Sequence, residues 1–330
     1  MYRKIAISTC GLFILLSVFL LSKGGASASA TSRNWNITTP VIHQINNYIS
    51  YNSPALLKYN GALYVAYVGT DHNLYITSST DGGVTFADDV QITNAGQNTS
   101  APGLTSYKGH LYVAWISTNV TGAQVNIGYY DTYTNSSQLK NYTTIAAPNA
   151  CSRTSLSSLE RVLYVAWKDC DAGKPYGHTI EIAASSDGQN FTRNAMIPPS
   201  GGLDSGPSLL AFHDTLYVAW RDMYNGQYFY IATYPGTGQT LQNATRLNIG
   251  GLGTLAMTAF HNQIWVSWDE TASQYNVAYY NGTDQLQNQQ STGIDNGTGP
   301  GFTAYEGHLY IAWAAIRTDT NRGQLFIARL

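Results

Sequence analysis

Charged side chains that could act together on a polar ligand recur at a few places in this sequence. Arginine suits such a role because its planar guanidinium binds a carboxylate through two hydrogen bonds, and carboxylates can act as general acid and base. Only 11% of the 330 residues are charged, so this concentration favours a binding site, although loop ends also tolerate charge without a function. The candidate ligand-binding residues are Arg153, Lys168, Asp169, Asp204, Arg221, Asp222, Asp269, Glu270 and Arg317.

Two short segments have the spacing of oxygen ligands for a metal ion. Residues 169–173 and 319–323 both read D-x-[DN]-x-G, and closely spaced oxygens before a glycine turn can hold Ca²⁺. Neither segment has the downstream glutamate of an EF-hand loop, so we expect ordinary Asx turns. Histidine- and cysteine-based metal motifs and phosphate-binding loops do not occur in the sequence. We therefore predict no metal site, no cofactor and no assignable catalytic residue.

One covalent link is predicted, between Cys151 and Cys170. The midpoint of the two positions is 160.5, which is the centre of the expected turn at Glu160 and Arg161. The two cysteines then face each other across one hairpin, provided that no bulge intervenes, and facing cysteines have a suitable separation. In an oxidising compartment we expect a disulfide there.

The first thirty residues look like a secretory signal peptide. Arg3 and Lys4 precede an apolar run over 5–22, and the small residues of 24–30 contain two overlapping A-x-A cleavage sites. An uncleaved anchor is the alternative, because the apolar run is long enough to cross a bilayer. In either case we expect residues 31–330 to form a single domain outside the cytoplasm, in a secreted protein with no other membrane contact.

The composition favours an all-β protein. Apolar residues make up 44% of the chain and aromatic residues 12%, with 25 Tyr and 31 Gly. Such a chain is too apolar and too weakly charged to be disordered. Its formal net charge of −2 argues against a nucleic-acid partner. Abundant aromatic and β-branched residues with frequent glycine are typical of short strands and tight turns.

The elements that must position the charged residues come from an internal repeat. A Leu-Tyr-Val-Ala-Trp motif, with small variations, occurs six times at intervals of 45 to 53 residues. A period near fifty with short strands is typical of a β-propeller. The six copies therefore predict a monomeric six-bladed β-propeller. The motifs begin at Leu63, Leu111, Leu163, Leu216, Ile264 and Leu309.

Each repeat is expected to supply a four-stranded antiparallel blade, with strands a to d from the inside outward. In the first repeat we place the strands at 54–59, 62–68, 74–78 and 90–93. The last repeat ends at Leu330 after its strand c, at 325–328, so it lacks strand d. We predict that residues 35–42 join the sixth blade as its outer strand and close the ring, which removes two open sheet edges.

Propeller geometry separates the loops into two ends. The a–b and c–d turns share one end, and the b–c and d–a connections share the other, where propeller ligands usually bind. All nine candidate residues fall at the b–c/d–a end.

The tryptophans of the repeat motif recur at one motif position, so we assign them to the blade cores rather than to sugar-stacking platforms.

A short motif after the first strand c carries a family resemblance. Ser79, Asp81, Gly83, Thr85 and Phe86 match the Asp box S-x-D-x-G-x-T-W, with Phe in the aromatic position, and residues 185–191 form a shortened version. In such a box, Asp accepts turn N–H groups and Gly supplies a positive φ, so we expect a structural role. The chain therefore resembles the sialidase-like (BNR-repeat) six-bladed propellers.

That resemblance implies possible hydrolase chemistry. Sialidases hold the substrate carboxylate with three arginines and use a tyrosine nucleophile with a glutamate, and an aspartate as acid/base. Here Arg153, Arg221 and Arg317 could supply the arginines, and Glu270 could be the glutamate. The family's first arginine belongs to an arginine–isoleucine–proline motif, and the corresponding residues 39–43 contain no arginine.

Three functions remain open from the sequence. Our leading hypothesis is recognition of an extracellular glycan at the b–c/d–a end, because Tyr, Asn and Gln are abundant and no clear catalytic set is present. The alternatives are a divergent sialidase-like glycoside hydrolase and a scaffold for protein contacts.

Overall fold

The second strand of each repeat forms the middle of a sheet that is covered on both faces. In the computed structural model the six motifs lie in strands β3 (Ala62–Val68), β7 (His110–Asn119), β11 (Val162–Asp169), β15 (Thr215–Arg221), β19 (Gln263–Asp269) and β23 (His308–Arg317). The third motif residue is 0% exposed in every repeat: Val65, Val113, Val165, Val218, Val266 and Ile311. Apolar residues on both faces of a strand require neighbouring sheets on both sides, which is the geometry of stacked blades.

The structure describes residues 35–49, 52–96, 100–120, 122–171, 173, 178–197, 205–222, 228–251, 253–269, 274–295, 297–317 and 322–330. The chain divides into two units, Met1–Trp35 and Asn36–Leu330, and the second contains all the described strands. The predicted signal peptide, residues 1–30, lies outside the described residues. Across the described ranges no helix is long and apolar enough to cross a membrane.

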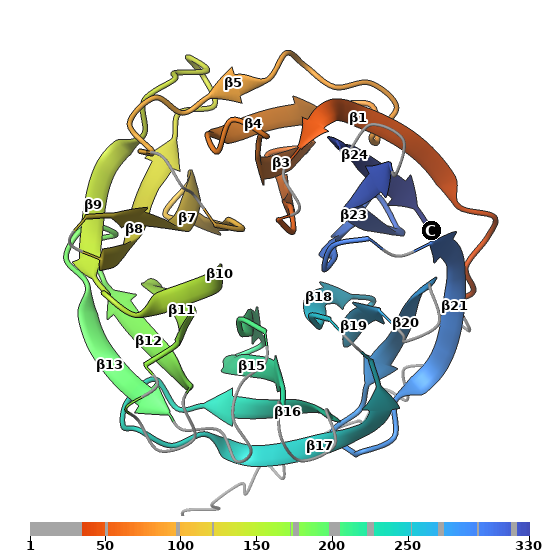
Figure 1. Ribbon diagram of the computed structural model, residues 1–330. Helices are drawn as coiled ribbons and strands as arrows, with labels where there is room; N and C mark the ends of the chain where they lie inside the picture. Colours follow the sequence, from red (N-terminus) through yellow and green to blue (C-terminus); the bar gives the residue numbers. More distant parts are fainter. Residues whose placement is uncertain are drawn as a thin grey trace, which may run out of the picture. The chain divides into compact units, whose positions relative to one another are not determined.

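The described strands form six four-stranded antiparallel sheets, named blades 1 to 6 in chain order (Figure 1). The inner strands a are β2 (Ala55–Tyr59), β6 (Gly103–Tyr107), β10 (Ala150–Leu159), β14 (Ser208–Phe212), β18 (Ala256–Phe260) and β22 (Gly301–Tyr305). The third strands c are β4 (Leu74–Ser79), β8 (Gly122–Tyr130), β12 (Thr179–Ser185), β16 (Tyr228–Tyr234), β20 (Gln274–Tyr280) and β24 (Arg322–Arg329). The outer strands d are β5 (Val90–Gln91), β9 (Lys140–Ala146), β13 (Thr192–Ile197), β17 (Gln242–Gly250), β21 (Gln287–Asp295) and β1 (Val41–Ile49).

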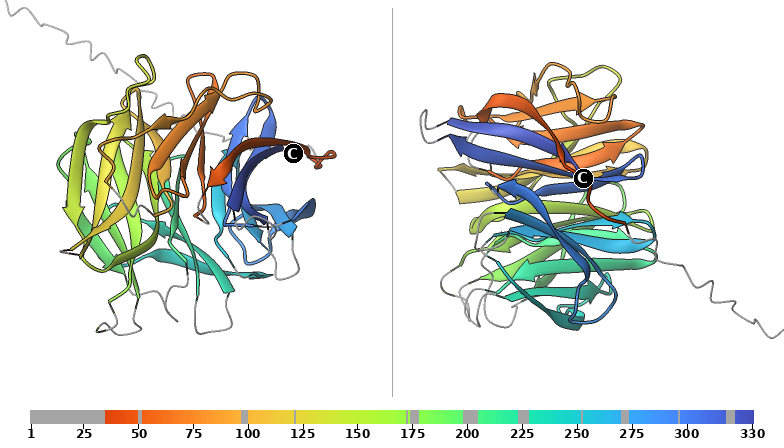
Figure 2. Two further views of the ribbon diagram at one scale, coloured as in Figure 1. Left: turned by 45° about the horizontal axis from the view of Figure 1, so that its top comes forward. Right: turned by 90° about the vertical axis from the view of Figure 1, so that its right-hand side faces the viewer.

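The blades surround a central axis. The inner strands run roughly along this axis, whereas the outer strands, such as β13, β17 and β21, follow the rim of the ring (Figure 1, Figure 2). The predicted fold class, an all-β six-bladed propeller with four-stranded blades, is confirmed. The motif tryptophans are buried as predicted: Trp115, Trp167, Trp220, Trp268 and Trp313 are between 0% and 4% exposed.

The ring is closed by the N-terminal strand, as predicted, but over residues 41–49, which share only Val41 and Ile42 with the predicted segment 35–42. β1 pairs antiparallel with β24, from Val41 opposite Arg329 to Ile49 opposite Gly323. The predicted segment 35–42 was therefore placed too early. Proline has no N–H to donate to a ladder, so the strand begins only after Pro40. The segment before it instead reaches blade 5, where the Ile37 N–H donates to Gln290 at 2.7 Å.

The closing strand is also fastened to blade 1. The Asn46 Nδ2 donates to the Tyr67 hydroxyl at 2.7 Å, and it also contacts the Asp89 carboxylate. Ile49 is 1% exposed and forms an isolated bridge with Gly69. β1 thus pairs along its length with blade 6 and is tied to blade 1 by the Asn46 side chain and by one backbone bridge.

Strand a has one unpaired edge in every blade, so its backbone groups need other partners. Hydroxyl groups of the preceding blade supply several of them. The Leu209 N–H donates to Ser155 Oγ at 2.9 Å and the Ala211 N–H to Ser157 Oγ at 2.8 Å. In the opposite direction, the Thr154 hydroxyl of blade 3 donates to the Ala114 carbonyl on the motif strand β7 of blade 2 at 2.8 Å. Small hydroxyl residues on strand a therefore join neighbouring blades along the axis.

Tyrosines at the end of strand a join the a–b turns. Tyr59 donates to the Gly109 carbonyl at 2.6 Å, Tyr107 to the Arg161 carbonyl at 2.7 Å, and Tyr305 to the Gly61 carbonyl at 2.9 Å. These tyrosine ties link blade 6 to 1, 1 to 2 and 2 to 3. The equivalent residues of blades 3, 4 and 5 are Leu159, Phe212 and Phe260, which have no hydroxyl.

We expect Tyr107→Phe to lower the free energy of unfolding by about 1–3 kcal/mol, since one buried hydroxyl loses its hydrogen bonds to the Arg161 and Ser186 carbonyls. Urea denaturation of wild type and variant measures the difference. Tyr133→Phe is the control, because Tyr133 is 89% exposed. Equal stability of Tyr107→Phe and wild type would contradict a contribution from this tie.

The Asp box occupies the turn between β4 and β5. Asp81 accepts the Thr85 N–H at 2.9 Å and the Thr85 hydroxyl at 2.5 Å, and Ser79 Oγ donates to it at 2.8 Å. Gly83 has a φ of +87° and donates its N–H to Ser79 Oγ. In the shortened box, Asp187 accepts the Asn190 side chain at 2.7 Å in place of a threonine hydroxyl. Both boxes thus close a turn around one carboxylate.

The Asp box predicts a pH-dependent stability difference for Asp81→Asn. Hydrogen bonds from Thr85 and Ser79 lower the pKa of Asp81 below its usual range. Its stabilising effect is therefore fully present above the unfolded pKa of about 4 and is lost as the pH falls through the folded pKa. Urea midpoints should differ between wild type and variant at neutral pH and converge in strong acid. The exposed Asp88→Asn is the control, and a difference independent of pH would contradict this origin.

Candidate functional site

Buried charges gather at the b–c/d–a end of three consecutive blades. Directly after the motif, blade 3 carries Lys168 and Asp169, blade 4 Arg221 and Asp222, and blade 5 Asp269. These five side chains are exposed by 7%, 4%, 2%, 0% and 7% respectively. The position directly after the motif is occupied by Val68, Ile116 and Ala314 in blades 1, 2 and 6. The six-fold repeat is therefore broken chemically on one side of the ring.

Three predicted residues cannot be placed with this group. Asp204 and Glu270 lie outside the described residues. Arg317 is the last residue of β23, in blade 6, and its side chain is outside the described part. The remaining six candidates come from blades 3, 4 and 5.

Arg153 lies in a bulge that the disulfide supports. The β10–β11 register shifts between Cys151 and Thr154, where Ser152 has a φ of +71°. Cys151 consequently pairs with Lys168, not with Cys170 as the bulge-free hairpin predicted. The Cys151–Cys170 disulfide nevertheless forms, with Cα atoms 6.0 Å apart. It clamps the end of the hairpin that carries Arg153, Lys168 and Asp169.

Arg153 occupies a position that is small in every other blade. Ser155 on strand a pairs with Ala166, the fourth residue of the motif, and Arg153 lies two residues before Ser155. The equivalent residues are Ser53, Ala101, Gly206, Thr254 and Gly299. The side chain lines an axial cavity of about 70 Å³, to which the inner strands of all six blades contribute. This volume holds a few atoms of a ligand or one or two water molecules, not a sugar.

The Arg153 guanidinium has unused hydrogen-bonding capacity. Its Nε and Nη1 atoms are buried and have no hydrogen-bond partner in the structure as described. Burial lowers the pKa of Arg153 to about 10, so the group is still a cation at neutral pH. Buried donors without partners are rare in folded proteins, and such a group is a candidate for binding an acceptor from outside the chain.

One buried charge was missed by the sequence analysis. Glu181 is 2% exposed on β12, where it pairs with Trp167. At the equivalent position of strand c, Tyr75, Tyr230 and Phe326 stack on the motif aromatic residue with ring centroids 5.3–5.5 Å apart. Blades 2 and 5 have the buried Asn126 and Asn276 there. Aligning the third strands as well as the motif strands would have shown Glu181 as the one charge in this series.

The Asp169–Gly173 segment is arranged as turns. The Asp171 N–H donates to the Asp169 carboxylate at 3.0 Å, and the Gly173 N–H to the Asp171 carboxylate at 2.9 Å. Each aspartate thus accepts the N–H two residues on, as in an Asx turn. Across the described ranges no three His, Cys, Asp or Glu side chains gather as a metal site would require. The second such segment, 319–323, lies mostly outside the described residues.

By sequence, the chain matches no family model and no curated protein. By structure, it is similar to an α-L-arabinanase of Penicillium chrysogenum complexed with arabinobiose (TM-score 0.68, 13% identity, covering 89% of this chain and 98% of that one). A protein of unknown function from Dyadobacter fermentans has a TM-score of 0.67 at 13% identity, over 87% and 98% of the two chains. A Trypanosoma rangeli sialidase has a TM-score of 0.58 at 11% identity, over 87% of this chain and 55% of that one.

The fold is the sialidase-like six-bladed propeller. The resemblance first suggested by the Asp box is thereby confirmed at the level of the fold. Identities of 11–13% carry the fold alone.

The contact between Gly206 and Arg153 gives a stability prediction. A Cβ on Gly206 would lie 2.8 Å from the Arg153 carbonyl oxygen and would overlap the Arg153 Cγ. Gly206→Ala should therefore lower the free energy of unfolding by about 1–3 kcal/mol. Gly250→Ala is the matched control, since nothing lies within 4 Å of its added Cβ. Thermal unfolding of both variants checks the prediction, and an unchanged Gly206→Ala midpoint would contradict this packing.

Proposed function

We propose that the protein binds an extracellular carbohydrate at the b–c/d–a end of blades 3, 4 and 5. Within the part of the chain that the structure describes, all the buried charged side chains lie on these three blades, and this observation carries the proposal. Burying a charged side chain is costly unless it is paired or used. A scaffold that needed only stable blades could use the small or apolar residues found in blades 1, 2 and 6.

The confinement of the described buried charges to three adjacent blades supports a single binding site. A lectin with one site per blade would repeat its binding residues with the motif, but among the described residues the buried charges occur only in blades 3 to 5. Sugar hydroxyls can donate to Asp169 and Asp269 and accept from Lys168, which are 4% to 7% exposed, whereas Arg221 and Asp222 are closed to solvent. Arg153 supplies donors for a sugar oxygen or a carboxylate. The disulfide fits an extracellular, oxidising location.

Glycoside hydrolysis is the second candidate. Three carboxylates, on Asp169, Asp222 and Asp269, lie on adjacent blades, and glycosidases commonly use a pair of carboxylates. The solved structures that share this fold include an arabinanase holding arabinobiose and a sialidase holding an inhibitor. Because those sequences are so different, their reactions are a guide to which substrates to test first.

Binding and turnover can be separated in one experiment. The secreted protein is applied to a glycan array and incubated with fluorogenic α-L-arabinofuranoside and sialoside substrates. We expect saturable binding of a defined glycan, weakened roughly tenfold or more in Arg153→Gln because charge-assisted hydrogen bonds are lost. Turnover that disappears in Asp269→Asn would establish the hydrolase.

Lys140→Gln is the control for these variants, since Lys140 forms a surface ion pair with Asp131 on blade 2. Thermal unfolding of each variant verifies that the propeller is intact. No binding and no turnover by the intact wild-type protein would refute a carbohydrate function and leave the protein scaffold.

A further inference from the structure

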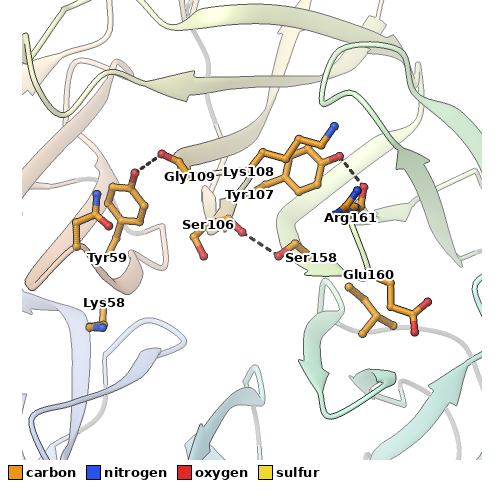
Figure 3. Close-up of a pocket in the computed structure, with 11 residues that line it drawn as sticks. Lys58, Tyr59, Ser106, Tyr107, Lys108, Gly109, Ser158, Glu160 and Arg161 are labelled. Atoms are coloured by element: carbon orange, nitrogen blue, oxygen red, sulfur yellow. Dashed lines mark hydrogen bonds between the residues drawn. The ribbon is translucent and has the colours of Figure 1, made fainter.

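A second hollow lies at the opposite end of the axis, where the a–b turns of blades 1, 2 and 3 meet (Figure 3). Its volume is about 590 Å³, within the range of small-molecule sites. Lys58 and Tyr59 lie on one side, Ser106 and Lys108 between, and Arg161 on the other side. It is therefore distinct from the group of charges on blades 3 to 5 and independent of the function proposed for that group.

The charge of this hollow is predominantly positive. Lys58, Lys108 and Arg161 line it together with a single carboxylate, Glu160, although the whole chain has a net charge of −2. Lys108 Nζ donates to the Ser186 carbonyl at 2.7 Å. The Lys58 ammonium and the Arg161 guanidinium are exposed and make no hydrogen bond or ion pair with any described residue. Two cations are therefore available to a ligand.

The backbone at Arg161 adds an independent observation. Arg161 has a φ of +66° in the second central position of its turn. The same position holds Gly61, Gly109 and Gly307 in blades 1, 2 and 6, with φ between +74° and +78°, and Asn262 in blade 5. A left-handed conformation costs a residue such as arginine roughly 1–2 kcal/mol. The chain thus keeps an arginine where glycine would fold more easily, and no described contact uses its side chain.

The three turns are held in place by hydrogen bonds across the hollow. Tyr59 donates to the Gly109 carbonyl, and Tyr107 to the Arg161 carbonyl. Ser158 Oγ donates to the Ser106 carbonyl at 2.8 Å. Figure 3 shows these bonds running from one turn to the next. A cationic lining on a fixed frame loses little conformational entropy when it binds an anion.

We propose that this hollow binds an anionic oligosaccharide, with its sulfate or carboxylate groups on Lys58, Lys108 and Arg161. Ser106, Ser158 and the Asn60 amide can hydrogen-bond the sugar hydroxyls. A peptide ligand would need apolar anchor pockets, but the Tyr59 and Tyr107 rings here are only 6% and 3% exposed. The lining therefore favours a saccharide over an acidic peptide.

Isothermal titration with three probes tests this site: a sulfated dextran oligosaccharide, the same oligosaccharide without sulfate, and polyglutamate. We expect one-to-one binding of the sulfated probe that weakens as salt is added, and weaker or no binding of the other two. Lys58→Gln and Arg161→Gly should each reduce the affinity roughly tenfold, as loss of a charge-assisted contact does. Lys140→Gln, an exposed lysine on the outer strand β9, should not.

Arg161→Gly also separates binding from folding. Glycine relieves the left-handed strain, so the melting temperature should rise by roughly 1–4 °C while binding is lost. Sulfated-probe binding that survives in both Lys58→Gln and Arg161→Gly, or falls equally in Lys140→Gln, would overturn the proposal. Tighter binding of polyglutamate than of the sulfated probe would overturn the assignment to a saccharide.

Discussion

The antiparallel pairing of β1 with β24 brings the first and last strands of the propeller into one sheet. Every blade packs both its faces on its neighbours, so a ring left open at one junction would expose the apolar faces of two blades. Without β1, blade 6 would lack its outer strand and would expose a backbone edge. The side-chain contacts of Asn46 with Tyr67 and Asp89 also join this strand to blade 1. A single strand therefore completes both the last sheet and the junction of the last blade with the first.

Once the ring is closed, the blades need not be chemically alike. The motif strands are interchangeable in their buried positions, whereas the residues that follow them are charged in blades 3 to 5 and apolar in blades 1, 2 and 6. At the other end of the axis the division runs differently, with cations on blades 1 to 3 and the carboxylates of Asp214 and Glu306 on blades 4 and 6. The symmetric core thus leaves each end free to carry a different, asymmetric surface.

The architecture could be predicted from the sequence because the repeated motif places apolar residues on both faces of one strand in every blade. Six copies of the motif at a regular spacing are compatible with few other folds. In the structure Val65 and its equivalents are fully buried. The cysteine pair was readable too, because both lie equidistant from one turn. Two details escaped because they depend on local backbone choices. Pro40 delays the closing strand, and the bulge at Ser152 and Arg153 changes which residue faces Cys151.

The candidate site was readable only in part. Because every motif strand ends at the b–c/d–a end of the propeller, the residues that directly follow a motif could be assigned to that end from the sequence. Lys168, Arg221 and Asp269 were predicted in this way. Glu181 was not predicted because it lies outside the motif strand, between Ile180 and Ile182. Its place opposite Trp167 follows from the pairing of β11 with β12. The cationic hollow was not foreseen, because Lys58, Lys108 and Arg161 are far apart in sequence and meet only when three a–b turns come together.

The uneven distribution of the tyrosine ties has a mechanical consequence. Hydroxyls of Tyr305, Tyr59 and Tyr107 fasten the turns from blade 6 through blade 3. Leu159, Phe212 and Phe260 cannot do so, and the turns of blades 4 and 5 are joined instead by His213 Nε2 and Asn262 Oδ1, 2.8 Å apart. The a–b turns of one half of the ring are therefore linked in series by tyrosine hydroxyls, and those of the other half are linked by different contacts. The cationic hollow lies over the tyrosine-linked arc, so a ligand bound there would rest on turns that are connected to one another.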